Sequence, residues 1–220
     1  MPLSISQYFL YNHIIMKIFP ETIPVFPLSG VIYFPKTNLP LNIFEKRYLD
    51  LINDIINKDK LMGMVQSKRK GQEVFKIGCL GKISDFQKSK DGRIIINLSG
   101  ITRFEIIKEI NSSKLYREFK VDYKKFNSDL KPIVGEFSID NLIKKVKIFF
   151  KRSGLLLNWS EFEKLDRKQK INTLAMIAPI TNEEKQKLIE SVSLKNIGEN
   201  LENIIDFYLH EKNLDNYTIQ

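Results

Sequence analysis

The sequence contains very little cysteine and histidine, and this scarcity excludes several kinds of site. Among 220 residues there is one cysteine, Cys79, and two histidines, His13 and His210. A single cysteine forms no internal disulfide and cannot build a multi-thiolate zinc site, and neither histidine has a partner at metal-ligand spacing. A catalytic histidine would have to come from one end of the chain. We therefore expect no metal site, no cofactor and no histidine-based catalytic triad.

Long hydrophobic runs and a phosphate-binding loop are also missing. No stretch approaches the roughly 20 apolar residues that a membrane helix needs. The first 20 residues lack the basic start and the small-residue cleavage site of a signal peptide. The segment nearest to G-x-x-x-x-G-K-[ST], Gly78-Cys79-Leu80-Gly81-Lys82, has the wrong spacing. The sequence thus predicts a soluble, cytoplasmic protein with no membrane partner and no Walker-type ATPase site.

Composition is otherwise that of a globular protein, and the chain divides into a strand-rich half and a helical half. Hydrophobic residues make up 43% and charged residues 28%. We expect a dispensable leader over residues 1–21, with Met1 or Met16 as the true start, a β domain over 22–130, an α-helical bundle over 131–212 and a tail over 213–220.

The first half has the turn residues and alternation of short strands. Ile77–Phe86 and Arg93–Leu98 flank Lys90-Asp91-Gly92, and an Asp-Gly pair between such runs predicts a hairpin. Phe104–Ile110 and Leu115–Tyr123 predict a second strand pair. Roughly six to eight such strands separated by turns favour a barrel or a sandwich over a parallel sheet.

Prolines break several of the strand-like runs. Val31–Phe34 and Leu39–Phe44 are examples, next to Pro35 and Pro40, and Pro24 and Pro27 lie just before them. Because proline has no N–H for a central ladder, we expect edge or kinked strands here. One helix, Glu45–Asn57, interrupts the strands.

The second half has helical periodicity and helix-capping signals. Apolar residues recur every three to four positions, which is typical of helices with one buried face. The expected elements are a helix over 139–150 that stops at Gly154, helices that begin at the capping boxes Asp166…Gln169 and Thr181…Glu184, and a last helix from Leu194 to about Glu211. The fold class is therefore α+β.

The net charge is +9, which is one argument for a nucleic-acid partner. The basic residues are 28 lysines and 7 arginines. Arginine is the residue suited to bidentate contacts with phosphates and base edges, so an excess of lysine is a weaker indication. The lysines of the 139–150 segment fit a solvated helix face equally well, next to Phe149 and Phe150 on the apolar face.

A Ser–Lys hydrolase is a further hypothesis. The S-x-x-K spacing occurs at Ser67/Lys70 and at Ser128/Lys131. In a chain so rich in lysine about two such matches arise by chance, and the companion motifs of the Ser–Lys enzymes are absent. The prediction is that the chain is not an enzyme.

One segment carries a resemblance to a known family. Residues 23–48 are IPVFPLSGVIYFPKTNLPLNIFEKRY. They resemble the N-terminal substrate-binding domain of the Lon protease family, whose signature is approximately P-L-F-P-L…V-L-F-P-G…L-P-L-x-I-F-E-x-R-Y. Lys36 stands where the family often has glycine, and Lys46 where it often has proline.

The resemblance extends over about residues 22–210, with several motifs in the same order. The further matching segments are Ile77-Gly78-Cys79-Leu80-Gly81-Lys82-Ile83, the Asp91-Gly92-Arg93 turn, Ser99-Gly100-Ile101-Thr102-Arg103-Phe104, Leu174-Ala175-Met176 with Pro179, and Glu183 to Leu188. The last two are similar to stand-alone bacterial members of the family.

The resemblance implies a PUA-like β pseudo-barrel with one inserted helix, followed by an α-helical bundle. It also implies non-catalytic recognition of unfolded or extended polypeptides, as an adaptor or holdase without ATPase or protease modules. A separate protease or chaperone is then a further partner. The alternative that stays open is an RNA-binding module of the PUA-like type, and the sequence does not define the oligomeric state.

Binding an extended chain calls for apolar surface and accessible strand edges. Each candidate apolar residue has an alternative role in the core, since alternation along a strand sends about half of the side chains inward. The candidate peptide-binding residues are Val31, Tyr33, Phe34, Leu39, Ile43 and Phe44. The motif residues expected to support the fold are Arg47, Tyr48, Gly78, Gly81 and Arg103, with the two arginines bonded to barrel carbonyls.

Overall fold

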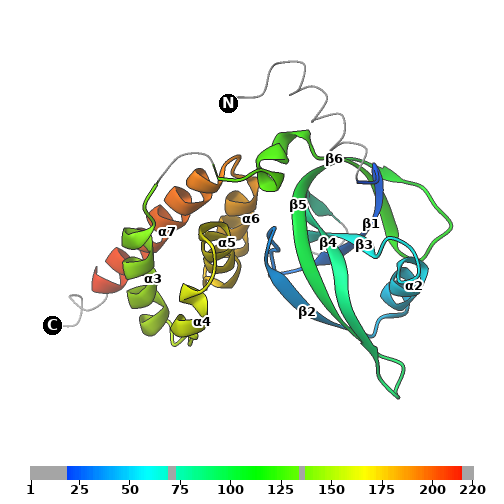
Figure 1. Ribbon diagram of the computed structural model, residues 1–220, viewed down its shortest axis with the longest axis horizontal. Helices are drawn as coiled ribbons and strands as arrows, with labels where there is room; N and C mark the ends of the chain where they lie inside the picture. The colour runs from blue at the N-terminus through cyan, green and yellow to red at the C-terminus, as the bar shows by residue number, and fades with distance from the viewer. Residues whose placement is uncertain (1–18, 69–72, 134–136, 215–220) are drawn as a thin grey trace.

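A sheet and a group of helices lie side by side in the computed structural model (Figure 1). The structure describes residues 19–68, 73–133 and 137–214. The predicted α+β class is confirmed. Within the described ranges, no helix has both the length and the apolar character to cross a membrane.

The strands form one mixed sheet that closes on itself. Their order is β2-β5-β4-β3-β1-β6, and an additional pairing of β5 with β6 closes the barrel, which leaves β2 outside the ring. The β1–β3 pair is parallel and the other pairs are antiparallel. The strands are β1 Thr22–Leu28, β2 Asn38–Ile43, β3 Leu61–Ser67, β4 Val74–Lys88, β5 Ile94–Ile110 and β6 Arg117–Asp122.

The long β4–β5 hairpin shapes the sheet. Its turn contains Gly92 at φ +87°, and the Arg93 N–H donates to Asp91 Oδ1 at 3.2 Å, as the Asp-Gly signal predicts. The two strands expected on either side of residue 100 are one continuous strand, β5. Its first part pairs with β2 and its last part with β6, so this strand has two further neighbours besides β4.

The predictions for the proline-containing runs were right in part. Leu39–Phe44 overlaps β2, which covers Asn38–Ile43 and is an edge strand. Val31–Phe34 is not a strand, and three of its four side chains are buried in the core. β1 contains Pro24 and Pro27 and yet lies between β3 and β6. The register explains this, because residues 22–25 pair with β6 and residues 25–28 with β3, so each proline has a paired strand on one side only.

The helices follow the predicted order, with two additional elements. Both expected capping boxes are present, Asp166 with Gln169 and Thr181 with Glu184, and Gly154 at φ +69° follows α3. The short α4 and the 3₁₀ helix η1 are too brief to give a periodic pattern. The helices are α2 Lys46–Ile55, η1 Lys124–Leu130, α3 Asp140–Arg152, α4 Trp159–Glu163, α5 Arg167–Ile177, α6 Asn182–Glu190 and α7 Leu194–Leu214.

One hydrophobic cluster runs through both parts of the molecule. It contains sheet residues such as Phe26 and Ile43 together with helix residues such as Val146 and Leu201. The sheet and the helices therefore share a core.

The segment before β1 also contacts the sheet. The Tyr123 hydroxyl donates to the Pro20 carbonyl at 2.9 Å, and the Phe19 ring lies 5.6 Å from the Tyr123 ring. The last residues of the expected leader, 19–21, thus belong to the folded part. Residues 1–18, which include Met16, lie outside the described ranges.

Candidate functional site

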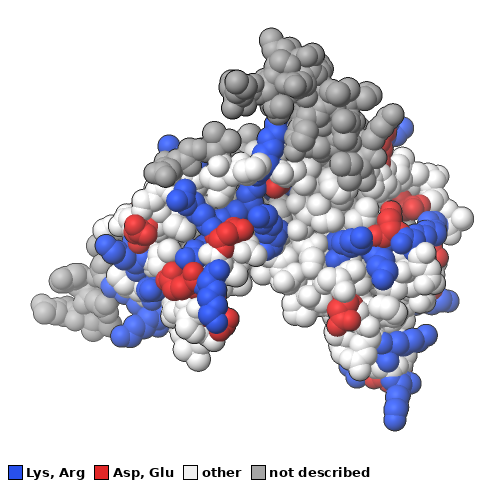
Figure 2. Space-filling model, viewed as in Figure 1, with Lys and Arg blue, Asp and Glu red and all other residues white. Residues whose placement is uncertain are grey.

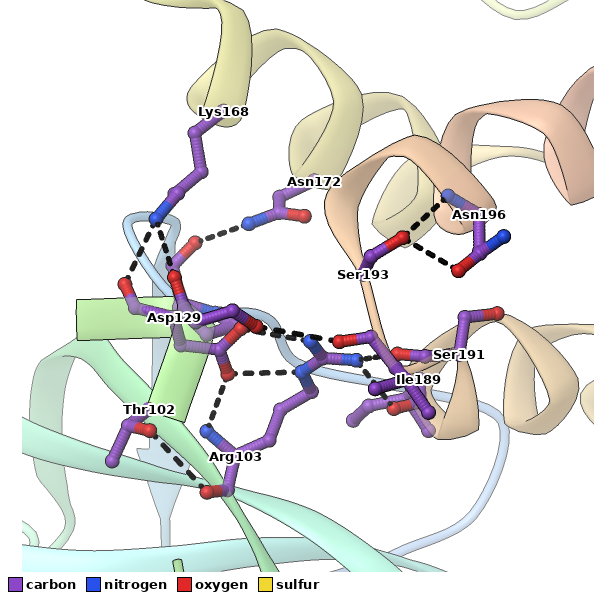
Figure 3. Close-up of polar contacts among 12 residues, drawn as sticks. Thr102, Arg103, Asp129, Lys168, Asn172, Ile189, Ser191, Ser193 and Asn196 are labelled. Atoms are coloured by element: carbon purple, nitrogen blue, oxygen red, sulfur yellow. Dashed lines mark hydrogen bonds and ion pairs between the residues drawn. The ribbon is translucent and has the colours of Figure 1, made fainter. Parts of the chain in front are cut away.

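A buried ion pair joins the sheet to the helices (Figure 3). Arg103 of β5 donates from its backbone N–H and from Nε to Asp129 Oδ2, both at 2.9 Å, and from Nη2 to Oδ1 at 2.8 Å. Nη1 donates to the carbonyl oxygens of Ile189, at 3.0 Å, and Ser191 at the end of α6. The guanidinium also lies 4.3 Å from the centre of the Phe126 ring. Arg103 thereby holds β5, η1 and α6 together.

Lys168 of α5 holds the end of η1 from the other side. Its ammonium donates to the carbonyl oxygens of Ser128, Asp129 and Lys131, at 3.3, 2.9 and 2.9 Å (Figure 3). The side chain is almost completely buried, and burial lowers the pKa of Lys168 from its usual value. The hydrogen bonds to three carbonyl oxygens offset the free-energy cost of removing the ammonium from water.

Asn172, one turn further along α5, has one satisfied and one unsatisfied end. Its Nδ2 donates to the Pro35 carbonyl at 2.8 Å. Its Oδ1 has no hydrogen-bond partner among the described residues and is shielded from water. Figure 3 shows that oxygen on the side of Asn172 opposite to the hydrogen bond from Nδ2, toward the side where α7 begins. An unpaired buried acceptor costs about 1–3 kcal/mol.

The start of α7 lies beside Asn172. Ser193 caps the helix, because its Oγ accepts from the Asn196 N–H at 3.1 Å and its carbonyl from the Ile197 N–H at 3.0 Å (Figure 3). Helix geometry leaves the N–H groups of Leu194 and Lys195 without an intrahelical acceptor. The start of the helix therefore carries a partial positive charge.

These groups enclose a cavity of about 420 Å³, which we call the junction cavity. Among the residues that the structure describes, the charged ones in its lining are three lysines, Lys131, Lys168 and Lys195, and one aspartate, Asp129, which sum to a formal charge of +2. Its apolar wall consists of Pro132, Ile133, Phe137, Leu194 and Ile197. Such a preformed, mostly apolar cavity with a few oriented polar groups is typical of a ligand site.

The predicted peptide-binding residues do not line this cavity. Tyr33, Phe34 and Ile43 are buried in the hydrophobic core, so we correct their assignment from ligand surface to core. Val31 and Leu39 are half-buried beside the same core. Phe44 alone is exposed, at 65%. For Val31, Leu39 and Phe44 a binding role stays a prediction.

The motif residues have structural contacts. Tyr48 is buried with its ring 4.2 Å from the Phe26 ring. Arg47 is exposed, donates from Nε to Glu45 Oε2 at 3.0 Å and lies over the Tyr48 ring. The two arginines were predicted to bond to barrel carbonyls and have other partners. Arg47 bonds to the carboxylate of Glu45, and Arg103 bonds to the carboxylate of Asp129 and to carbonyl oxygens at the end of α6.

The two motif glycines, Gly78 and Gly81, lie where strands pack too closely for a side chain. A Cβ on Gly78 would overlap the Met64 carbonyl oxygen. A Cβ on Gly81 would approach the Tyr33 ring and hydroxyl to less than 3.0 Å. This close packing explains why glycine stands at both positions of the motif.

The other sequence hypotheses meet structural alternatives. The Ser128 hydroxyl donates to the Val192 carbonyl at 3.3 Å, while Lys70, the partner expected for Ser67, lies outside the described residues. Among the residues that the structure describes, no three metal-ligating side chains form a cluster.

The basic helix face is balanced by acidic side chains. Lys145 contacts Glu202 at 2.8 Å and Asp206 at 2.6 Å, and basic and acidic side chains are interspersed over the helices in Figure 2. Phe149 and Phe150 are in the core, as predicted.

The sequence reasoning missed Lys168, Asn172 and Ser193. Lys168 and Asn172 are four residues apart, on the helical face that also carries Ile171 and Ala175. Polar residues among buried apolar positions of a predicted helix are the signal that could have identified them.

Comparison with known proteins gives the family. The model of the ATP-dependent protease La (LON) substrate-binding domain matches residues 22–206. The chain belongs to the Lon substrate-binding domain family. The Lon match covers the substrate-binding domain and none of the catalytic modules of the protease.

Relatives and solved structures agree with this assignment. The Lon protease of Syntrophus aciditrophicus is 25% identical over 197 residues, which cover 81% of this chain and 24% of that protease. The Lon protease of Desulfosudis oleivorans is 33% identical over 91 residues, 38% of this chain and 11% of the relative. The matched part of the chain thus spans about a quarter of the length of the first Lon protease and about a tenth of the length of the second.

Two solved structures have the same Lon N-terminal fold. The crystal structure of a Lon N-terminal domain protein from Xanthomonas campestris has a TM-score of 0.61 at 19% identity and covers 82% of this chain and 96% of its own. The N-terminal domain of a Mycobacterium avium complex Lon protease has a TM-score of 0.58 at 15% identity, with coverages of 84% and 98%.

Proposed function

We propose that this Lon-type domain recognises unfolded or extended segments of polypeptides and catalyses no reaction itself. The observation that carries the proposal is the match of residues 22–206 to a substrate-binding domain, together with a preformed cavity at the junction of its sheet and helices. The ligands of such a domain are protein chains, and it acts as an adaptor or as a holdase beside a separate protease or chaperone.

The construction of the junction cavity supports this function. Arg103 and Lys168 fix its wall through buried hydrogen bonds, so little order has to be created when a ligand enters. Its apolar side chains accept the kind of residue that a folded protein hides and an unfolded one exposes.

The test measures binding to one protein in two states. Fluorescently labelled α-lactalbumin, reduced and carboxymethylated, stays unfolded, and the calcium-bound native form is the matched control. We expect the anisotropy of the unfolded form to rise on titration with this protein and that of the native form to stay constant. Gel analysis of the same mixture should show uncleaved substrate.

The two modes of action give different results. A holdase suppresses light scattering by an aggregating substrate on its own, whereas an adaptor changes substrate turnover only when a protease is added.

Equal anisotropy curves for the unfolded and native forms would overturn the proposal.

A further inference from the structure

We propose that the junction cavity binds the C-terminal residue of a polypeptide, with its free carboxylate at the start of α7 and its apolar side chain against Phe137 and Ile197. This inference rests on the proposed function and specifies the part of the substrate that is recognised. Three independent features of the cavity each match one group of such a residue.

The first feature is the anion-binding character of the cavity rim. The N–H groups of Leu194 and Lys195 begin a helix of 21 residues, and such a helix start attracts a carboxylate. The three lysines around the cavity add to the attraction. The one carboxylate among the described lining residues, Asp129, is neutralised by two-point contact with Arg103, so it opposes an incoming anion only weakly.

The second feature is the unpaired Oδ1 of Asn172. A lone carboxylate or phosphate brings no donor for this oxygen, whereas a peptide brings a backbone N–H two bonds from the carboxylate carbon. Asn172 is only 3% exposed, and the hydrogen bond to the Pro35 carbonyl fixes the orientation of its side chain. Three side-chain amide oxygens are buried without a partner among the described residues, those of Gln66, Asn172 and Gln186, and of these three residues only Asn172 lines the junction cavity. A ligand that donates to Asn172 Oδ1 therefore supplies the partner that this oxygen lacks.

The third feature is the size and polarity of the wall. A volume of about 420 Å³ accommodates the end of an extended chain with a large aliphatic or aromatic side chain, and not a folded element. The side chains of Ile133, Phe137 and Ile197 are suited to a leucine- or phenylalanine-like group. A carboxylate, a backbone N–H and an apolar side chain on one and the same α-carbon occur only in the C-terminal residue of a polypeptide.

The decisive experiment compares two peptides that differ in one group. A fluorescent decapeptide ending in Ala-Leu is prepared with a free C-terminal carboxylate and as the C-terminal amide, and a third peptide ends in Ala-Asp. We expect the amide and the Asp-terminated peptide to bind at least tenfold more weakly than the free acid, because each lacks one matching group. In ¹⁵N-labelled protein, the free acid should shift the signals of the Leu194 and Lys195 amides and of the Asn172 side chain.

Two variants locate the effect. Lys195→Glu reverses a charge at the cavity rim on an exposed side chain, and Lys90→Glu makes the same change at the β4–β5 turn, far along the chain. Lys195→Glu should weaken the free acid about tenfold and leave the amide unchanged, while Lys90→Glu leaves both unchanged. Circular dichroism melting checks that both variants are folded.

The outcomes separate this inference from the proposed function. If the free acid and the amide bind equally, or if Lys195→Glu weakens both alike, the inference is wrong and polypeptide recognition stands. If peptides fail to bind while unfolded α-lactalbumin binds, the inference is again wrong. If the unfolded protein does not bind either, the proposed function fails as well.

Discussion

Arg103 and Asp129 meet in a two-point ion pair whose side chains are only 1% and 9% exposed. Replacing Asp129 by asparagine removes the negative charge and leaves a buried guanidinium without its charged partner. We expect Asp129→Asn to lower the free energy of unfolding by about 3–5 kcal/mol, as removal of one partner of a buried pair does. Urea unfolding followed by circular dichroism measures this.

An exposed ion pair gives the matched control. Arg93 Nη2 lies 2.6 Å from Asp91 Oδ2, but both side chains are about half exposed. Asp91→Asn should lower the free energy of unfolding far less than Asp129→Asn, because solvent screens the pair. Equal losses for the two variants would contradict the structural role of the Arg103–Asp129 pair.

Lys36 adopts a backbone conformation that suits glycine. Its φ is +60°, in the left-handed region, which costs a residue with a side chain about 1–2 kcal/mol. Its ammonium contacts Asp166 Oδ2 at 3.1 Å, but both side chains are about half exposed, so this pair is worth less than about 1 kcal/mol. Lys36→Gly should therefore raise the free energy of unfolding by about 0.5–1 kcal/mol.

Lys36→Ala separates strain from charge in the same measurement. Alanine loses the ion pair and keeps the strained φ, so it should be less stable than the wild type. A glycine variant no more stable than the alanine variant would show that the strain is not released.

Two glycines should respond to alanine in opposite directions. A Cβ on Gly78 would overlap the Met64 carbonyl oxygen and the Val65 side chain, both in β3, which is hydrogen-bonded to β4 at this position. Gly78→Ala should therefore lower the free energy of unfolding by about 1–3 kcal/mol. A Cβ on Gly198 in α7 would lie 3.7 Å from Ile171 Cδ1, an ordinary contact. Gly198→Ala should stabilise the protein by about 0.5–1 kcal/mol through helix propensity. Thermal melts test both, and a loss at Gly198 would contradict the packing.

The hydrogen bond from the Tyr116 hydroxyl to Asp54 Oδ2, at 2.6 Å, makes a pH-dependent contribution to stability. This bond lowers the pKa of Asp54, and burial together with Asp54 raises the pKa of Tyr116 to about 12. Because the Asp54 pKa is lower in the folded state, the contribution is complete above about pH 4 and is lost as the pH falls through the folded pKa.

Tyr116→Phe should thus cost about 0.5–1 kcal/mol at pH 7 and less at pH 2, given that Asp54 is half exposed. Tyr123→Phe is the control, since the Tyr123 hydroxyl donates to a backbone carbonyl that does not titrate in this range. Its cost should be the same at both pH values. A Tyr116→Phe cost that does not change with pH would exclude the coupling to Asp54.

Local signals in the sequence predicted the parts of this fold that depend on neighbours in the chain. The capping boxes at Asp166 and Thr181 and the Asp91-Gly92 turn appear as expected, because each is formed by hydrogen bonds within a few residues. The resemblance to Lon domains, carried by motifs in order, gave the family that the comparison confirms.

Long-range contacts decided what could not be predicted. Tyr33 and Phe34 belong to a non-strand segment that the core buries, and β5 continues through Gly100 because the backbone of Lys36 and Thr37 bonds to it there. The junction cavity is formed by η1, α5 and the start of α7, which are far apart in the sequence. Periodicity within one segment carries no information on such a meeting of segments.

The place of β1 between β3 and β6 has a consequence for how the protein is made. During synthesis β1 leaves the ribosome before the other strands of the barrel, yet one of its two neighbours, β6, is completed only about 100 residues later, at Asp122. Until then the barrel stays open between β1 and the missing β6, and the nascent chain exposes unpaired strand edges to chaperones and to other chains.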